Sequence, residues 1–270
     1  MYSFVDVINN EYMEGRKLKK LISAAFMVVM FACFSASALA EERAKEGNWD
    51  FNLAPLYIWM VNMEGDFGIA KADLPVDVDF GTLFDNLESI FTVHFEAMHR
   101  SNWGFFFDYS GLDTSASGAL VAPPVTITID FASTLIEAGG VYRIKNGPHV
   151  FDMLGGVRYT KLEPDLTITP PGGKRGLSED WYDPIIGLRY FYDFDNKWML
   201  SARGDIGGFG VGCDFTWNVA ALVHFQPWKN LAFIGGYRVL DQDYESGSGP
   251  GRFKYDMRLA GPVLGLNFVW

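Results

Sequence analysis

The stretch GPVLGLNFVW, residues 261–270, alternates between two sets of positions. One set is apolar and ends on two aromatic residues, and it consists of Leu264, Leu266, Phe268 and Trp270. The other set is Val263, Gly265, Asn267 and Val269. A period of two is the signature of a β-strand with two different faces. The stretch therefore predicts a strand whose apolar face carries Phe268 and Trp270 outward.

The same alternation recurs upstream from Trp49 and predicts about ten strands, with an aromatic apolar face and a polar face in most of them. The predicted strands cover residues 49–61, 89–100, 103–110, 125–144, 151–160, 182–193, 198–205, 215–226, 231–239 and 253–270. In the first, Trp49, Tyr57 and Trp59 are assigned to a single face. In the fourth, a β-bulge is expected near residues 132–134 to place Glu137 and Arg143 on one face. A unit of one or two glycines with arginine and tyrosine recurs at residues 139–143, 155–159, 187–190 and 235–238.

The connections alternate in length. Short ones are expected at residues 101–102, 145–147, 194–197 and 227–230, and longer ones at 62–88, 115–124, 164–180, 208–214 and 244–252. Residues 62–88 could form a long loop, an extra hairpin or a segment folded into the mouth of a barrel, with one helical turn near residues 82–87. Eight or twelve strands therefore remain open alternatives.

These features resemble those of bacterial outer-membrane β-barrel proteins of the small porin-like or OmpA-like type, without indicating a subfamily. The resemblance implies an all-β fold, a single antiparallel up-and-down transmembrane β-barrel with short periplasmic turns and long extracellular loops. It implies contact with outer-membrane lipid and lipopolysaccharide, and insertion by the barrel-assembly machinery with Phe268 and Trp270 as the assembly signal. Interfacial aromatic girdles are expected from Trp49, Trp59, Trp103, Trp181, Trp198 and Trp270.

The N-terminus has the pattern of a secretory signal peptide. A basic segment at residues 16–20 precedes an apolar run at residues 21–34, and Ala38-Leu39-Ala40 resembles a cleavage site. The sequence predicts a leader over residues 1–40 and an outer-membrane barrel over residues 41–270.

Composition excludes several classes of function. The formal net charge of −11 argues against nucleic acid, which requires a basic surface. Of the two cysteines, Cys33 lies in the predicted leader, so Cys213 has no partner for an internal disulfide. No Cys/His cluster with zinc spacing occurs, and no metal or cofactor is predicted.

The polar face of the predicted strands carries balanced charge. Residues predicted to line the lumen are Glu96, Arg100, Asp108, Glu137, Arg143, Asp152, Arg158, Asp183, Arg189, Arg203, Asp205 and Arg238. They could form a paired network that fills the barrel, or a polar constriction that selects solutes by charge.

We expect porin-like passive passage of small solutes. The alternative is a non-conducting structural or surface-interaction barrel. An outer-membrane lipid-modifying enzyme ranks last, because His94, His99, His149 and His224 match no known barrel-enzyme motif, and no catalytic residue is assigned. His94 and His224 are expected to face the lumen.

Residues 1–12 precede the basic segment in an unusual way for a signal peptide. We therefore predict that Met13 is the true start of translation. N-terminal sequencing of the precursor should begin at Met13, and a precursor that begins at Met1 would contradict this.

Overall fold

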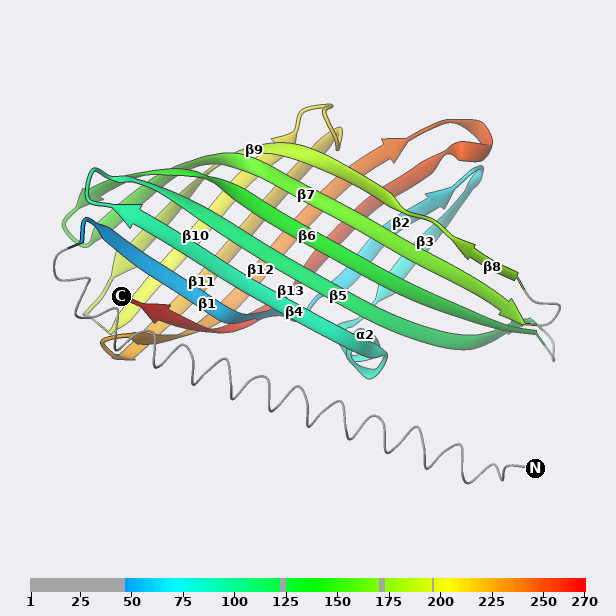
Figure 1. Ribbon diagram of the computed structural model, residues 1–270, viewed down its shortest axis with the longest axis horizontal. Coiled ribbons are helices and arrows are strands. Elements are labelled where there is room, and N and C mark those ends of the chain that lie inside the picture. The colour runs from blue at the N-terminus through cyan, green and yellow to red at the C-terminus, as the bar shows by residue number, and fades with distance from the viewer. Residues whose placement is uncertain (1–46, 122–124, 170–172, 196) are drawn as a thin grey trace, which may run out of the picture. The chain divides into compact units, whose positions relative to one another are not determined.

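The computed structural model describes residues 47–121, 125–169, 173–195 and 197–270, with the side chains of 116–129, 166 and 168–175 left aside. The predicted signal peptide and the Met13 start lie outside the described residues. Within them, the chain is almost entirely β-strand (Figure 1). No described helix is long and apolar enough to cross a membrane.

Ten long strands form a closed antiparallel barrel, as the sequence predicted. The barrel strands are β1 (Trp49–Trp59), β4 (Leu87–His99), β5 (Trp103–Val121), β6 (Val125–Asn146), β7 (His149–Thr169), β9 (Glu179–Asp193), β10 (Trp198–Gly208), β11 (Phe215–Trp228), β12 (Leu231–Ser246) and β13 (Phe253–Val269). The additional elements are β2 (Asn62–Ile69), β3 (Ala72–Val78), β8 (Gly173–Gly176), helix α2 (Phe80–Asp85) and the 3-10 helix η1 (Gly249–Gly251). Short turns lie at one end of the barrel and long hairpins at the other (Figure 1).

Strand β13 closes the barrel by pairing with two different strands. Its residues 263–269 pair with β1, and its residues 253–260 pair with β2. β2 then pairs with β3, so residues 62–78 form the extra hairpin that the sequence left as one of three possibilities. This hairpin extends the wall at the hairpin end and does not change the number of barrel strands.

β1 contains a bulge that reverses its inside and outside faces. Its pairing with β13 shifts register between Leu53 and Leu56, next to Pro55, which has no backbone N–H to donate. The prediction that Trp49, Tyr57 and Trp59 share one face of β1 was therefore wrong. Tyr57 lines an interior cavity and Trp59 is buried, whereas Trp49 is exposed.

The prediction of a bulge near residues 132–134 was also wrong. β6 pairs with β5 and β7 without a register shift through residues 130–141. Glu137 and Arg143 are six positions apart, so an unbroken alternation already places them on one face. The loop predicted at residues 115–124 is shorter than expected, because β5 and β6 continue to pair with each other up to Val121 and Val125.

The outer face of the barrel carries an apolar belt. On β12 the belt covers residues 231–239, which include the exposed Phe233 and Tyr237. This length is close to the roughly 9–11 residues that a strand needs to cross a bilayer. Beyond the belt, towards the hairpin end, charged side chains replace apolar ones at Asp113, Lys161, Asp180, Asp241 and Arg258.

Aromatic side chains mark both margins of the belt. Trp49, Trp103, Trp198 and Trp228 are exposed near the turn end, and Phe91, Tyr109, Tyr159, Tyr182 and Trp217 lie near the hairpin end. The girdle prediction was wrong for Trp59 and Trp181, which are buried on inward-facing positions. On β13, unbroken pairing with β12 places Leu264 and Phe268 on the same outer face, where Leu264 is 56 % exposed and Phe268 is 1 % exposed. The role of Phe268 and Trp270 in assembly stays a prediction.

An ion cluster ties the extra hairpin to the barrel. Arg252 donates to Asp73 of β3 at 2.6 Å and to Glu245 of β12 at 2.9 Å. These hydrogen bonds hold the pKa of each carboxyl below its usual range. The depressed pKa values mean that the cluster contributes stability above the usual carboxyl pKa of about 4 and loses it as the pH falls further.

Two adjacent strands approach closely at paired glycines. Gly139 of β6 lies opposite Gly156 of β7, and Gly140 lies opposite Gly155. A Cβ atom on Gly139 would collide with the Gly155 carbonyl and approach Phe106 Cε1 to 2.8 Å. A Cβ atom on Gly140 would have its nearest neighbour at 4.0 Å. The inward glycine is therefore required by packing, and the outward one is not.

We predict that Gly139→Ala destabilises the barrel by about 1–3 kcal/mol, the usual cost of overpacking, because the backbone of β7 must move. Gly140→Ala is the matched control and should change stability by less than about 0.5 kcal/mol. Urea unfolding of both variants in detergent micelles measures the difference. Equal stability of the two variants would contradict this assignment.

Candidate functional site

The barrel interior contains two planes of ion pairs. The plane nearer the turn end joins Arg143, Arg189, Glu96 and Asp152. Arg143 donates to both carboxylate oxygens of Asp152, at 2.7 and 2.8 Å, and to Glu96 at 3.0 Å. Arg189 bridges the same two acids at 2.5–3.0 Å. Two cations and two anions thus balance in this plane, with both guanidinium groups over the Phe191 ring.

The second plane lies nearer the middle of the barrel and is built on Glu137. Arg158, Arg203 and Arg238 each donate to Glu137 at 2.8–2.9 Å. Asp205 accepts from Arg158 at 2.7 Å and from Arg203 at 2.8 Å. These hydrogen bonds come from strands β6, β7, β10 and β12, so the network crosses the whole lumen. Arg158 is fully buried, and Glu137 is 1 % exposed.

An aromatic layer follows on the hairpin side of the ion pairs. Trp181 stacks on Tyr244 with ring centroids 4.0 Å apart, and Tyr255 packs against Trp181 at 5.6 Å. The layer is completed by Leu162, Cys213, Phe253 and Met257. Asp183 accepts from the Trp181 indole at 3.2 Å and from the Cys213 backbone at 2.6 Å. Packed side chains therefore occupy the lumen directly on the hairpin side of the ion pairs.

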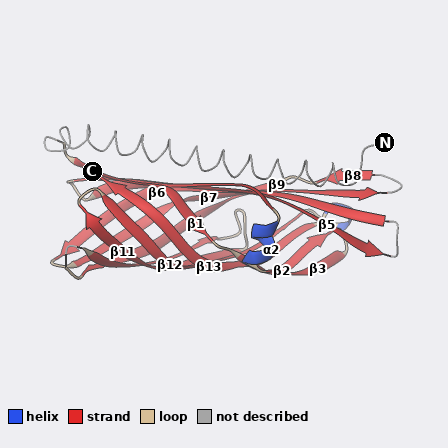
Figure 2. Cartoon of the chain, turned by 90° about the horizontal axis from the view of Figure 1, so that it is seen from below, coloured by secondary structure: helices blue, strands red, loops and turns tan. Residues whose placement is uncertain are grey.

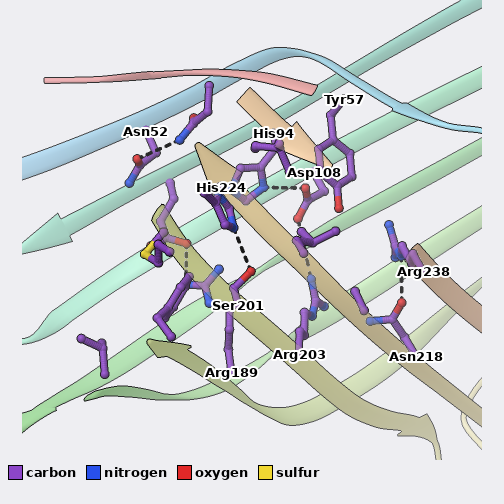
Figure 3. A pocket seen from close by; sticks show the side chains of 18 of the residues that line it. Asn52, Tyr57, His94, Asp108, Arg189, Ser201, Arg203, Asn218, His224 and Arg238 are labelled. Atoms are coloured by element: carbon purple, nitrogen blue, oxygen red, sulfur yellow. Dashed lines mark hydrogen bonds and ion pairs between the residues drawn. The ribbon is translucent and has the colours of Figure 1, made fainter. Parts of the chain in front are cut away.

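A cavity of about 220 Å³, lined by both polar and apolar side chains, remains in the turn-side half of the lumen. We call it the vestibule. Figure 3 shows its labelled side chains converging from several strands. Its lining includes Asn52, Tyr57, His94, Asp108, Arg189, Ser201, Arg203, Asn218, His224 and Arg238. Both interior histidines that the sequence indicated lie here.

Each vestibule histidine has one polar partner (Figure 3). His94 Nδ1 lies 2.6 Å from Asp108 Oδ1, and His224 Nε2 lies 2.8 Å from Ser201 Oγ. The other carboxylate oxygen of Asp108 is buried and forms no hydrogen bond with any described residue. Its nearest cation is Arg203, whose Nη1 lies 4.0 Å away. A buried acceptor without a donor is an open position for a ligand or a water molecule.

The structure brings together the predicted lumen residues except Arg100. Arg100 is exposed in the turn after β4, because the strand ends at His99. Asp183 faces inward, but it belongs to the aromatic layer. The remaining residues of that set form the two planes or line the vestibule.

Tyr57 is the vestibule residue that the alternation pattern placed on the wrong face. Pro55 is the signal that could have corrected it, since proline inside a strand favours an edge or a bulge. No three His, Cys, Asp or Glu side chains among the described residues converge as possible metal ligands.

Comparison with solved structures gives the fold its context. The outer membrane protease OmpT from Escherichia coli is similar over 83 % of this chain and 97 % of its own, with a TM-score of 0.55 and 8 % identity. The translocator domain of the autotransporter NalP from Neisseria meningitidis is similar over 98 % of this chain and 97 % of its own, with a TM-score of 0.49 and 12 % identity. The chain thus has the fold of bacterial outer-membrane β-barrel proteins.

No protein-family model matches the chain. No curated protein matches it either. At 8 % identity the likeness to OmpT concerns the fold alone.

We predict that Glu137→Gln destabilises the protein by about 3–5 kcal/mol, the usual cost of leaving buried charges uncompensated. Three arginines would lose their common carboxylate. The matched control is Glu163→Gln, which removes an exposed pair with Lys161 and should cost less than about 1 kcal/mol. Unfolding in urea compares them, and similar midpoints would argue against a stabilising network.

Proposed function

We propose that the protein is an integral outer-membrane barrel that does not conduct along its axis and acts as a structural or binding barrel. The observation that carries this proposal is the plane of Arg158, Arg203, Arg238, Glu137 and Asp205, which crosses the lumen with every carboxylate paired. Opening a path would separate buried charges, at a cost of several kcal/mol.

The apolar belt supports a position in a lipid bilayer. A closed barrel leaves no unpaired sheet edge in most of its wall, which is the condition for strands to cross hydrocarbon. By the usual arrangement of such barrels, the short turns face the periplasm and the long hairpins face outward. The vestibule then lies towards the periplasm, and the long hairpins are available for contacts at the cell surface.

Porin-like passage, which the sequence favoured, has weaker support. It would require an aqueous route past both ion-pair planes and past the Trp181–Tyr244 stack. The vestibule offers a space of about 220 Å³ with a mixed polar and apolar lining, which suits retention of a small molecule on one side better than transit.

A hydrolytic role also has weaker support. Ser201 and His224 lie at the distance expected of a nucleophile and its base. A working dyad also needs a group that orients the imidazole. Among the described residues, no carboxylate contacts His224 within hydrogen-bond distance. We therefore retain the proposal that the protein is not an enzyme.

The purified protein should give no resolvable current steps in a planar lipid bilayer. The reason is that the paired plane around Glu137 occupies the axis. Insertion must be verified independently, by protease protection of the barrel in the same membranes. Reproducible ohmic current steps from inserted protein would overturn the proposal and favour porin-like passage of small solutes instead.

A further inference from the structure

The barrel wall splits on one side, between β1 and β4. These strands pair only over residues 49–54 of β1 and 94–99 of β4. Residues 87–93 of β4 pair with β5 alone, and β3 pairs with β2 alone in the described part of the chain. We call the split between residues 55–59 and residues 87–93 the seam. Within it, the Tyr57 backbone N–H donates to Thr92 Oγ1 at 3.1 Å.

Helix α2 connects β3 to β4 beside the seam. Its start is held by a hydrogen bond from the Phe80 backbone to the Asn62 side chain of β2, at 2.8 Å. Just after its end, Asn86 accepts from the Ser115 backbone of β5, at 3.0 Å. In both ribbon views α2 lies near this side of the barrel (Figure 1, Figure 2). Among the described strands, no continuous ladder of backbone hydrogen bonds therefore closes this part of the wall.

The seam lies at the level of the apolar belt. Ile58 is the register partner of Leu264, which belongs to the belt, and Phe91 contacts Tyr109 of the hairpin-side girdle. The rim is apolar and exposed, with Phe91 at 62 % and Phe84 of α2 at 59 %. Ile90 is exposed as well, although its position in β4 points inward. Lipid chains are the surroundings that suit such a rim.

A small cavity lies directly behind the seam. Its volume is about 20 Å³, and it is lined by Tyr57, Trp59, Thr92, Val93, Asp108, Tyr109, Ser110, Leu135, Glu137 and Arg238. Tyr57, Asp108 and Arg238 line both this cavity and the vestibule. The seam, the small cavity and the vestibule thus follow one another through the wall, and Asp108 with its unpartnered oxygen stands between the two cavities.

We propose that the seam admits an uncharged single-chain amphiphile from the membrane, whose hydroxyl head group donates to Asp108 and whose alkyl chain leaves the barrel between β1 and β4. The head group supplies the donor that Asp108 lacks. The apolar rim suits the chain. A carboxylate head group is disfavoured, because it cannot donate to Asp108 and would face it with like charge. The nearby guanidinium groups of Arg203 and Arg238 already donate to Glu137. The present cavity holds about one water molecule, so entry requires the Tyr57–Thr92 hydrogen bond to open.

This inference rests on the proposed function, since a route from the membrane requires the barrel to lie in lipid. The two can fail separately. Conductance tests the axis of the barrel, and the experiment below tests its wall.

The experiment uses the full-length barrel in phospholipid vesicles and a long-chain alcohol that carries a photoreactive diazirine near its hydroxyl end. After illumination, mass spectrometry locates the labelled residues. We expect label on interior residues behind the seam, such as Leu135 and Tyr57, which unlabelled alcohol displaces. The matching diazirine fatty acid should label the outer belt and leave these interior positions largely unlabelled.

Engineered cysteine pairs test the seam itself, in a Cys213→Ser background. Leu56→Cys with Val93→Cys flanks the Tyr57–Thr92 hydrogen bond, and its disulfide should abolish interior labelling until it is reduced. Leu53→Cys with Phe95→Cys joins register partners in the paired region and should leave labelling unchanged. If the first pair does not oxidise, Thr92→Val provides a second test, because loss of the hydrogen bond should increase interior labelling.

Asp108→Asn tests the head-group assignment. The alcohol should lose its advantage over the fatty acid, because the like charge is removed and the amide can donate. Label confined to the outer belt, or interior label that is insensitive to both the disulfide and Thr92→Val, would overturn the route. Equal interior labelling by alcohol and acid in the unmodified protein would overturn the assignment of the ligand class.

Discussion

Pairing between β1 and β13 is the interaction on which the rest of this structure depends. Without it, the sheet would present two open edges, and unpaired backbone groups are not tolerated in hydrocarbon. Once the sheet closes, alternation assigns each side chain to one of two environments. Closure therefore creates both the apolar belt outside and the polar space inside.

The polar space inside a barrel of this size is narrow, and here arginine and carboxylate side chains fill it. These side chains satisfy one another's hydrogen-bonding groups. Glu137 accepts from three arginines, and Asp152 accepts from two. An arginine has a rigid planar fork of five donors that can pair with carboxylates of several strands at once, whereas lysine has three donors and no such fork. Such a network fixes strands that are far apart in sequence, and the vestibule lies on its turn side.

The fold could be predicted from the sequence because a period of two specifies a strand and its faces together. The strands and most of the inward charged residues followed from that rule, whereas the closure was implied by the resemblance to outer-membrane barrels. The rule failed where the register changes or the strand ends: the bulge at Pro55 turned Tyr57 and Trp59 inward, and Arg100 fell in a turn. The vestibule and the seam depend on pairing between distant strands, about which a local pattern contains no information.

The double pairing of β13 has a consequence for biogenesis. Its partners β1 and β2 lie about 200 residues earlier in the chain, so closure is among the most non-local contacts possible here, and such contacts form slowly. Until β13 meets β1 and β2, the chain remains an unclosed polypeptide whose aromatic residues are accessible to water. With a formal net charge of −11, unfolded copies of the chain repel one another. This repulsion opposes aggregation before the barrel closes.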